Sequence, residues 1–247
     1  MDKKELVEQL KIKFKELYME ENLSDLFMYR LQELETKSNN IYLQVVKYLQ
    51  DFVISNNDVE ELYDFAISVK GANIEKLEEA IIKTNNAEYI YKFAEEIEGA
   101  NIEKLEDAIC KTNDKKYIYK FARDVKGANI EKLTDAICKT NNKEYILEFA
   151  KDIKGANIEK LEEAIIKTND AFYIYLFAKY VKGANIEKLE ETIIKTNNAE
   201  YIYEFARDVK GANIEKLEEV YKKLQFGKKY QEDDLNKSIT DILGSLD

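Results

Sequence analysis

Residues 71–94 read GANIEKLEEAIIKTNNAEYIYKFA, and most of the chain consists of variants of this stretch. Its opening phrase returns every 28 residues (99 − 71 = 28). The copies begin at Gly71, Gly99, Gly127, Gly155, Gly183 and Gly211. A fixed period of this length is typical of stacked supersecondary units. We therefore expect a repeat protein whose core grows by the addition of units.

One period contains the signals of two short helices. In the second copy, Asn86 can cap a helix that buries Phe93 on its apolar face. Gly99 follows where a helix end adopts left-handed backbone, and Asn101 can cap the next helix at once. That second helix carries an apolar face around Leu105. Each period is therefore predicted to be an αα-hairpin, and stacking has to stabilise it because helices this short are marginal alone.

The predicted fold is all-α: a right-handed α-solenoid of six αα-hairpin repeats with helical N- and C-terminal caps. The repeats span residues 58–225, the N-terminal cap region is 1–57, and a C-terminal capping helix or tail follows in 226–247. The last repeat differs from the others at one apolar position. That column reads Ile82, Cys110, Cys138, Ile166, Ile194 and then Lys222. The charge indicates that no further repeat covers this end.

Three helices are expected in the N-terminal cap region. The first, in residues 1–22, has the apolar positions Leu6, Leu10, Phe14 and Leu17. The second begins after Ser24, which fits an N-cap, and runs to about Glu35. The third runs from Ile41 to about Ile54, and its apolar residues lie one period before those of a second repeat helix. It is therefore predicted to stack on the first repeat.

The composition favours a helical protein of the cytoplasm. The 247 residues include no Pro and 8 Gly, which is too little turn punctuation for an all-β fold. The N-terminal MDKKELVEQLKIKF lacks the apolar core of a secretory signal, and no apolar run reaches membrane-spanning length. The 2 Cys form no disulfide framework, which fits a reducing compartment. We expect a cytoplasmic protein without a membrane partner.

The phrase GANIEKLEEAIIKTNN, followed by YIYKFA, resembles repeat tracts in uncharacterised proteins of AT-rich bacteria and their phages. The bias toward Lys, Asn, Ile and Glu, with few Arg, fits that source. The chain is also similar to the broad class of α-solenoids that includes tetratricopeptide and HEAT-like arrays, although its period is shorter and their signature residues are absent. The resemblance covers about two thirds of the chain. It implies a general role in binding other macromolecules and brings no catalytic residues.

The sequence predicts no enzyme. It contains no His, which removes the commonest general base and the commonest zinc ligand. Cys110 and Cys138 stand where other repeats have Ile, so they are interpreted as small apolar residues. Carboxylates such as Glu75 recur in every repeat, whereas an active site should be singular. No phosphate-binding glycine loop is present. We expect no catalytic residues, no metal site and no cofactor.

Two further sets of residues have both a structural and a functional interpretation. Tyrosines recur in two columns, Tyr89, Tyr117, Tyr145, Tyr173 and Tyr201, and Tyr63, Tyr91, Tyr119, Tyr175 and Tyr203. They fit packing between repeats, and the alternative is a base-stacking platform. Basic residues recur at the end of the first helix in repeats three to six, as Arg123, Lys126, Lys151, Lys154, Lys179, Lys182, Arg207 and Lys210. They fit compensation of the helix macrodipole, and the alternative is a track for an acidic partner or nucleic acid.

The fifth repeat differs from the others at three outward positions of its first helix. It has Phe172, Leu176 and Tyr180, whereas the fourth and sixth repeats have Glu144, Glu148 and Asp152, and Glu200, Glu204 and Asp208. The i, i+4, i+8 spacing puts the three residues on one stripe. An exposed apolar stripe rich in aromatic residues usually marks a contact. The occupant is a partner protein, a second copy in a homodimer, or the chain's own C-terminal segment.

The sequence thus predicts a non-catalytic protein-binding scaffold. Phe172, Leu176 and Tyr180 are the predicted partner-binding residues, with Lys179 and Lys182 as nearby charges that orient the partner. The acidic charge and the resemblance together suggest an inhibitor of a host complex, such as an anti-defence protein. The alternative is a nucleic-acid-binding array that uses the basic residues, which the net charge of −11 disfavours.

Overall fold

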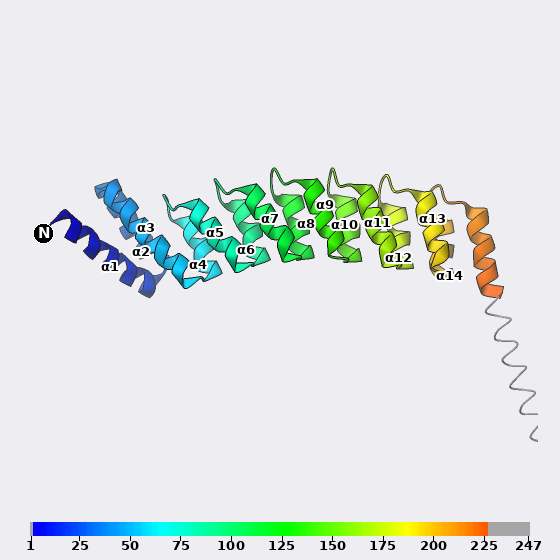
Figure 1. The fold of residues 1–247 in the computed structure, drawn as a ribbon, viewed down its shortest axis with the longest axis horizontal. Coiled ribbons are helices and arrows are strands. Elements are labelled where there is room, and N and C mark those ends of the chain that lie inside the picture. The colour runs from blue at the N-terminus through cyan, green and yellow to red at the C-terminus, as the bar shows by residue number, and fades with distance from the viewer. Residues whose placement is uncertain (1, 227–247) are drawn as a thin grey trace, which may run out of the picture. The chain divides into compact units, whose positions relative to one another are not determined.

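The computed structural model describes residues 2–226, which form α-helices joined by short turns (Figure 1). Contacts divide the chain into two compact units, Met1–Asn129 and Ile130–Asp247. The helices of the first unit are α1 (Lys3–Glu21), α2 (Asp25–Lys37), α3 (Asn39–Asn56), α4 (Val59–Ser68), α5 (Ile74–Thr84), α6 (Ala87–Glu96), α7 (Ile102–Thr112) and α8 (Lys115–Asp124). Those of the second are α9 (Ile130–Lys139), α10 (Lys143–Asp152), α11 (Ile158–Thr168), α12 (Ala171–Tyr180), α13 (Ile186–Lys195), α14 (Ala199–Asp208) and the helical residues 214–226.

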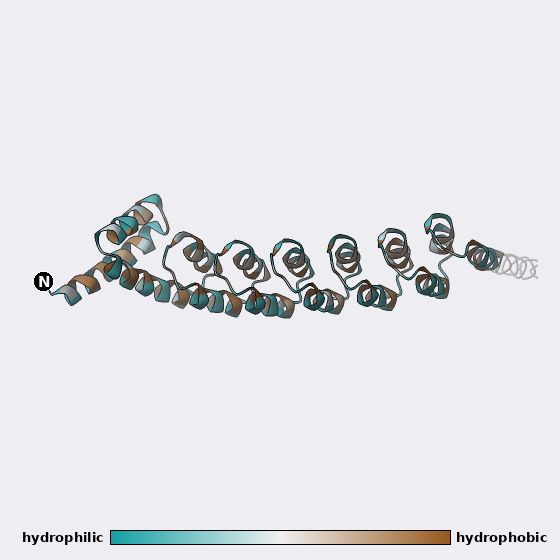
Figure 2. Ribbon diagram, turned by 90° about the horizontal axis from the view of Figure 1, so that it is seen from above, coloured by the Kyte–Doolittle hydropathy of each residue, from teal (hydrophilic) through white to brown (hydrophobic). Residues whose placement is uncertain are grey.

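The predicted all-α repeat solenoid is confirmed, because consecutive helices pack as neighbouring pairs within each unit. First helices of successive repeats lie against each other, as in α4, α6 and α8, and in α10, α12 and α14. Second helices do the same in α5 and α7, and in α9 and α11. Figure 2 shows the two rows that result within each unit. The handedness of the solenoid stays a prediction, and the predicted C-terminal cap beyond residue 226 lies outside the described residues.

The turns of each repeat follow the predicted capping. The Asn86 side chain accepts hydrogen bonds from the backbone N–H groups of Glu88 and Tyr89, and Asn101 accepts from that of Lys104. Gly99 has φ +85°, a left-handed conformation that a Cβ atom would strain. A second left-handed residue, present in each of the first five repeats, was not predicted. It is an Asn at the end of the second helix, at positions Asn85, Asn113, Asn141, Asn169 and Asn197.

The N-terminal helices α1, α2 and α3 pack on one another, and α3 also contacts α4 and α5. The predicted apolar face of α1 is wrong at Leu6, which is 36% exposed. The buried residues of α1 are Val7, Phe14 and Tyr18. The face is rotated because the Tyr18 ring packs edge-on against Phe27 of α2, with ring centroids 5.5 Å apart. Helical periodicity alone did not show which side of α1 packs against α2 and α3 together.

A buried carboxylate joins most of the repeats to the next one. Glu78 is 1% exposed, and its Oε2 accepts the backbone N–H of Asn101 at 2.6 Å. Asn101 is the N-cap of α7, so the carboxylate lies at the positive end of that helix dipole. Equivalent bonds join Glu106 to Asn129, Glu162 to Asn185 and Glu190 to Asn213. Each bond connects residues 23 apart and therefore crosses a repeat boundary.

Lysine residues on the capped helices balance these buried charges. Lys104 Nζ lies 3.9 Å from Glu78, Lys188 Nζ 3.4 Å from Glu162, and Lys216 Nζ 3.0 Å from Glu190. Burial nevertheless raises the pKa of the Glu78 carboxyl, which shows that the compensation there is incomplete. A buried charge is stable only when it is paired and hydrogen-bonded, so this arrangement explains a Glu column inside the core.

The column has two informative exceptions. Gln50 of α3 exchanges two hydrogen bonds with the Asn73 backbone, at 2.7 Å and 3.2 Å. These bonds show that α3 stacks on the first repeat, as the sequence predicted, while its role as a terminal cap stays a prediction. In the third repeat the position is Thr134, whose hydroxyl donates to the Ile130 carbonyl oxygen of its own helix. The Thr134 side chain therefore forms a hydrogen bond within α9, whereas the glutamate at this position in other repeats bonds to the next repeat.

Candidate protein-binding face of the fifth repeat

The α12 helix is capped by Asp170, whose carboxylate accepts the backbone N–H groups of Phe172 and Tyr173 at 3.1 Å and 3.3 Å. The helix buries the residues that face its neighbours, which are Ala171, Ile174, Tyr175, Phe177 and Ala178. With that face fixed, the helical period turns Phe172, Leu176 and Tyr180 outward. We call these three residues the α12 stripe.

The α12 stripe lies at the surface of the structure. Phe172 is 39% exposed and Tyr180 is 54% exposed, while Leu176 is half-buried. Neighbouring first helices carry carboxylates at the matching positions, such as Glu144 and Glu200, and these are exposed as well. The structure thus places the predicted stripe on one face, with an apolar surface where the repeat otherwise presents charge.

Aromatic neighbours hold Phe172, the first residue of the α12 stripe, in place. The Phe172 ring contacts Tyr173 and Tyr201, with centroid distances of 5.3 Å and 5.4 Å. Tyr201 in turn stacks on Tyr175, at 6.2 Å. Sequence reasoning assigned Tyr201 to a packing column and missed its support of Phe172. Tyr201 follows Phe172 by 29 residues, one more than the repeat period, and this spacing was the signal in the sequence that the two rings could meet.

Lys179 has a structural partner. Its Nζ donates to Asp208 Oδ2 and to the Tyr175 hydroxyl, each at 2.7 Å. The hydrogen bond to Asp208 raises the pKa of Lys179, so the lysine stays charged. Lys182 lies beyond the end of α12 and is exposed. Of the two predicted orienting charges, Lys182 is therefore the one that points to solvent, while Lys179 joins α12 to α14.

The tyrosine columns pack between repeats, as predicted, wherever the structure gives a partner. Tyr63 donates to Glu96, Tyr91 to Asp124, and Tyr175 to Asp208, each 33 residues further on. Burial raises the pKa of Tyr91, and its hydrogen bonds to carboxylates add to the shift. These hydroxyl groups form hydrogen bonds between repeats, which fits the packing role that the sequence predicted.

Several of the recurrent basic residues are neutralised by neighbouring carboxylates. Arg123 pairs with Asp124, at 2.7 Å, and lowers the pKa of that carboxyl. Arg207 pairs with Glu204 and Asp208. Those that are exposed and have no ion pair among residues 2–226 are Lys126, Lys151, Lys154, Lys182 and Lys210. Within residues 2–226, therefore, Arg123, Lys179 and Arg207 are paired with carboxylates, while the other five recurrent basic residues are not.

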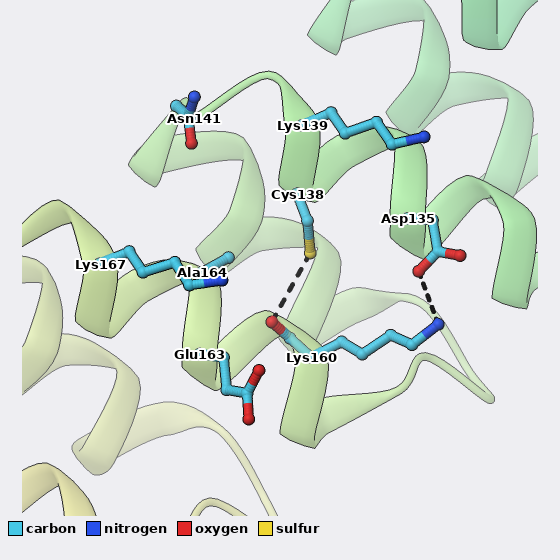
Figure 3. A pocket seen from close by; sticks show the side chains of 8 residues that line it. All are labelled: Asp135, Cys138, Lys139, Asn141, Lys160, Glu163, Ala164 and Lys167. Carbon is cyan, nitrogen blue, oxygen red and sulfur yellow. Dashed lines mark hydrogen bonds and ion pairs between the residues drawn. The ribbon is translucent and has the colours of Figure 1, made fainter.

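A cleft of about 340 Å³ lies between α9 and α11, beside Cys138 (Figure 3). Cys138 Sγ contacts the Lys160 carbonyl oxygen at 3.7 Å, and Lys160 Nζ pairs with Asp135 at 2.6 Å. Burial raises the pKa of the Cys138 thiol to about 11, so it is not an activated nucleophile. The structure forms no disulfide at Cys110 or Cys138.

The same cleft occurs between α3 and α5, where it has a volume of about 410 Å³. Asp51, Ile54 and Lys76 line it at the positions that Asp135, Cys138 and Lys160 occupy in the other cleft. A cleft with this lining therefore occurs at two helix junctions of the described structure. It does not distinguish the third repeat as a binding site.

Two further searches of the described residues gave no site. Residues 2–226 contain no group of three or more His, Cys, Asp or Glu side chains that could hold a metal ion. None of the helices in that range is long and apolar enough to cross a membrane. The predicted absence of catalysis and of a cofactor stays a prediction.

Comparisons with known proteins give no family. A scan against models of protein families finds no match, and a search of curated proteins finds none. Among solved structures, one match is described as "Computational Design of Self-Assembling Cyclic Protein Homooligomers". It is 16% identical, covers 94% of this chain and 95% of its own, and has a TM-score of 0.16. A TM-score this low carries no argument about fold or function.

Proposed function

We propose that this protein is a non-catalytic helical-repeat scaffold that binds another protein surface through the α12 stripe. The observation that carries the proposal is the exposure of Phe172 and Tyr180 on a helix whose neighbours have carboxylates at the matching positions. Isolated apolar residues are common on protein surfaces, but three in one stripe form a contiguous patch. Aromatic residues of this kind dominate the binding energy of many interfaces.

The stripe has the properties of an interface centre. Burying a large apolar side chain contributes about 1.5–3 kcal/mol. Phe172 is already ordered by Tyr173 and Tyr201, so binding costs little side-chain entropy there. Exposed Lys151, whose Nζ lies 6.0 Å from the centre of the Tyr180 ring, and exposed Lys182, which follows the end of α12, supply a polar rim. The rest of the repeat surface is charged and serves solubility.

The narrower hypothesis is an inhibitor that occludes the nucleic-acid channel of a host defence complex. It rests on the net charge of −11 and on the resemblance of the repeat phrase to tracts in phage proteins. An acidic array would compete for the basic groove of such a complex. A direct test is whether the purified protein lowers nucleic-acid binding by defence complexes of a bacterial host. The failure of that test leaves the scaffold proposal intact.

The scaffold proposal is tested by site-specific photo-crosslinking in cells of the source organism. A photo-reactive phenylalanine analogue at position 172 should crosslink a protein chain, identified by mass spectrometry. The same analogue at Glu60, the matching position of the first repeat, is the control and should give no adduct. The absence of any protein adduct at position 172 contradicts the proposal.

A second experiment tests the energy of the contact. The double substitution Phe172→Lys and Tyr180→Lys should abolish protein capture while helicity stays unchanged, because both side chains point to solvent. The matched control is Glu60→Lys with Ser68→Lys, at the corresponding exposed positions of α4. Capture by the stripe variant that equals capture by the wild-type protein rules out the stripe.

A further inference from the structure

Carboxylates flank the α12 stripe on both sides. Helices α10 and α14 both pack against α12, as its neighbours in the row of first helices. Because successive repeats have the same fold, matching positions of these helices lie side by side on one face. The neighbours carry acidic residues at the positions that match the stripe, which are Glu144, Glu148 and Asp152 in α10 and Glu200, Glu204 and Asp208 in α14. The apolar stripe therefore lies between two rows of carboxylates.

Contacts at both edges of the stripe place the neighbouring helices next to it. On the α14 side, the centre of the Phe172 ring lies 5.4 Å from that of Tyr201, the residue after Glu200. On the α10 side, the Nζ atom of Lys151 lies 6.0 Å from the centre of the Tyr180 ring. The outward side chains of α10 and α14 thus border the stripe and can reach a segment that covers it.

Three of the six carboxylates are already engaged within the protein. Arg207 pairs with Glu204 and with Asp208, and Lys179 pairs with Asp208 as well. Asp152 also has a partner within the protein. A segment that binds the stripe would have to replace these interactions, so these three carboxylates contribute little to the choice of a partner.

The other three carboxylates are unpaired. The side chains of Glu144, Glu148 and Glu200 form no ion pair with any residue in the described range 2–226. They occupy the positions that match Phe172 and Leu176, and therefore lie around the amino-terminal half of the stripe. The unpaired charges beside that half are all negative, whereas the unpaired lysines of this face lie at its opposite end.

From this arrangement we propose that the α12 stripe binds a basic amphipathic helix of a partner protein. The inference rests on the proposed function, since it names the chemistry of the partner at the same surface. A helix that lies along α12 can set an apolar face on the stripe and carry Lys or Arg on both sides of that face. Helices in contact lie about 8–10 Å apart, and the long basic side chains can extend sideways to Glu144 and Glu148 on one side and to Glu200 on the other.

An extended segment fits this face less well than a helix. Successive side chains of a strand point to opposite faces, so only a single row of residues would meet the surface. Cations could then not flank an apolar row on both sides. The helix supplies three rows at once, which matches the apolar stripe and its two acidic borders.

A second copy of this chain does not have the required chemistry in its own stripe. When two stripes meet in the antiparallel direction, Glu148 lies opposite Glu148 of the other copy. When they meet in the parallel direction, Glu148 lies opposite Glu204. Like charges that face each other across an interface disfavour the complex, and the same carboxylates repel the phosphates of a nucleic acid.

The first test measures the binding of a labelled synthetic peptide to the full-length protein by fluorescence anisotropy, at about 0.15 M salt, where exposed charges further apart than about 8 Å are largely screened. The peptide is an amphipathic helix with Leu along one face and Lys on both sides of that face. The wild-type protein should bind it and should not bind a matched peptide with Glu in place of Lys. Phe172→Lys with Tyr180→Lys should abolish the binding, because the apolar contact is lost.

Two variants of equal net charge then test the acidic borders. The first variant carries Glu144→Gln, Glu148→Gln and Glu200→Gln. The control variant replaces exposed carboxylates of second helices that have no ion pair within residues 2–226, and carries Glu103→Gln, Glu159→Gln and Glu187→Gln. The first variant should raise the dissociation constant of the Lys peptide at least about tenfold, and the control less than about twofold. A wild-type protein that does not bind the Lys peptide, or an equal loss in both variants, overturns the inference.

The crosslinking experiment separates failure of this inference from failure of the proposed function. An adduct from position 172 to a basic, amphipathic segment of another protein supports both. An adduct to an uncharged or acidic segment of another protein, or to any part of a second copy, overturns the basic helix and leaves the scaffold proposal standing. A crosslink within one chain, to residues 227–247, means that the chain covers its own stripe and overturns both.

Discussion

At the scale of single residues, the least expected feature is the buried Glu column. Glu78, Glu106, Glu162 and Glu190 lie in the core, yet each contributes a hydrogen bond that the backbone of the next repeat needs. The first N–H groups of a helix have no partner inside the helix. A carboxylate from the preceding repeat satisfies one of them and also meets the positive end of the dipole. The carboxylate therefore links each of these repeats to the repeat that follows it.

Glu162 is the position at which this role is best tested. Glu162→Ala removes the acceptor of the Asn185 N–H and leaves a cavity, and should cost about 2–3 kcal/mol of unfolding free energy. Glu162→Gln keeps an acceptor, as Gln50 does for Asn73, and should cost less than about 1 kcal/mol. Chemical denaturation followed by circular dichroism measures both. Glu163→Ala, at the exposed neighbour, is the control, and an equal loss in all three variants contradicts the assignment.

Asp208 makes stability depend on pH. Its hydrogen bonds with Arg207, Lys179 and Tyr175 lower the pKa of the carboxyl in the folded state. Because the unfolded pKa is about 3.9, this contribution is complete above that pH and is lost as the pH falls through the folded pKa. The melting temperature should therefore drop between about pH 4 and pH 2, and less so in Asp208→Asn. Glu159→Gln, at an exposed carboxylate, is the control, and identical pH profiles for all three proteins refute the prediction.

At the scale of helices, one junction between repeats lacks the hydrogen bond that a buried glutamate forms at the others. Most second helices carry a glutamate that bonds to the next repeat, but α9 carries Thr134 at that position. Lys160 of α11 pairs instead with Glu131 and Asp135 of α9, each at 2.6 Å. These pairs are exposed and contribute little to stability. The junction between the third and fourth repeats is therefore held mainly by apolar packing.

Thr134→Glu should strengthen that junction. The longer carboxylate can reach the Asn157 N–H as its counterparts reach Asn101 and Asn185, and should add about 1 kcal/mol of unfolding free energy. Thr134→Val is the control, since it changes only the bond to the Ile130 carbonyl oxygen. The denaturation midpoint is the measurement. A lower midpoint for Thr134→Glu than for Thr134→Val would show that the site does not accept the carboxylate.

At the scale of the whole molecule, the charge balance leads us to expect no binding to nucleic acid. The net charge is −11, and Arg123, Lys179 and Arg207 are paired with carboxylates of the protein itself. Electrostatic binding to phosphates requires free Lys and Arg side chains. The exposed lysines near the stripe are better used in contacts with a protein surface that carries carboxylates.

We therefore expect no complex with labelled single-stranded or duplex DNA or RNA in a gel-shift experiment at low salt. Lys126→Glu with Lys154→Glu should behave like the wild-type protein. A complex that forms at low salt, dissociates as salt rises and is weakened by these substitutions would favour the nucleic-acid alternative.

The sequence by itself determined the helices and their order. The period of 28 residues, the cap residues Asn86 and Asn101, and Gly99 at the left-handed turn are local signals, and they predicted each hairpin. The α12 stripe was also visible, because repeats can be compared position by position and Phe172 replaces a charged residue. Local signals suffice here since capping and periodicity act within one or two turns of helix.

Only the tertiary structure decided how the surfaces of neighbouring repeats are used. It showed that Glu78 is buried and bonded 23 residues away, that Lys179 is held by Asp208, and that α1 presents Val7 rather than Leu6 to its neighbours. One hint was present in the sequence, since the position of Glu78 is never Asp in any repeat, whereas the next position is Glu79 in the first repeat and Asp107 in the second. The physical reason is that the partner of a carboxylate depends on which groups of another repeat lie within hydrogen-bond distance. The pattern of charges along one helix does not give the distances to groups in another repeat.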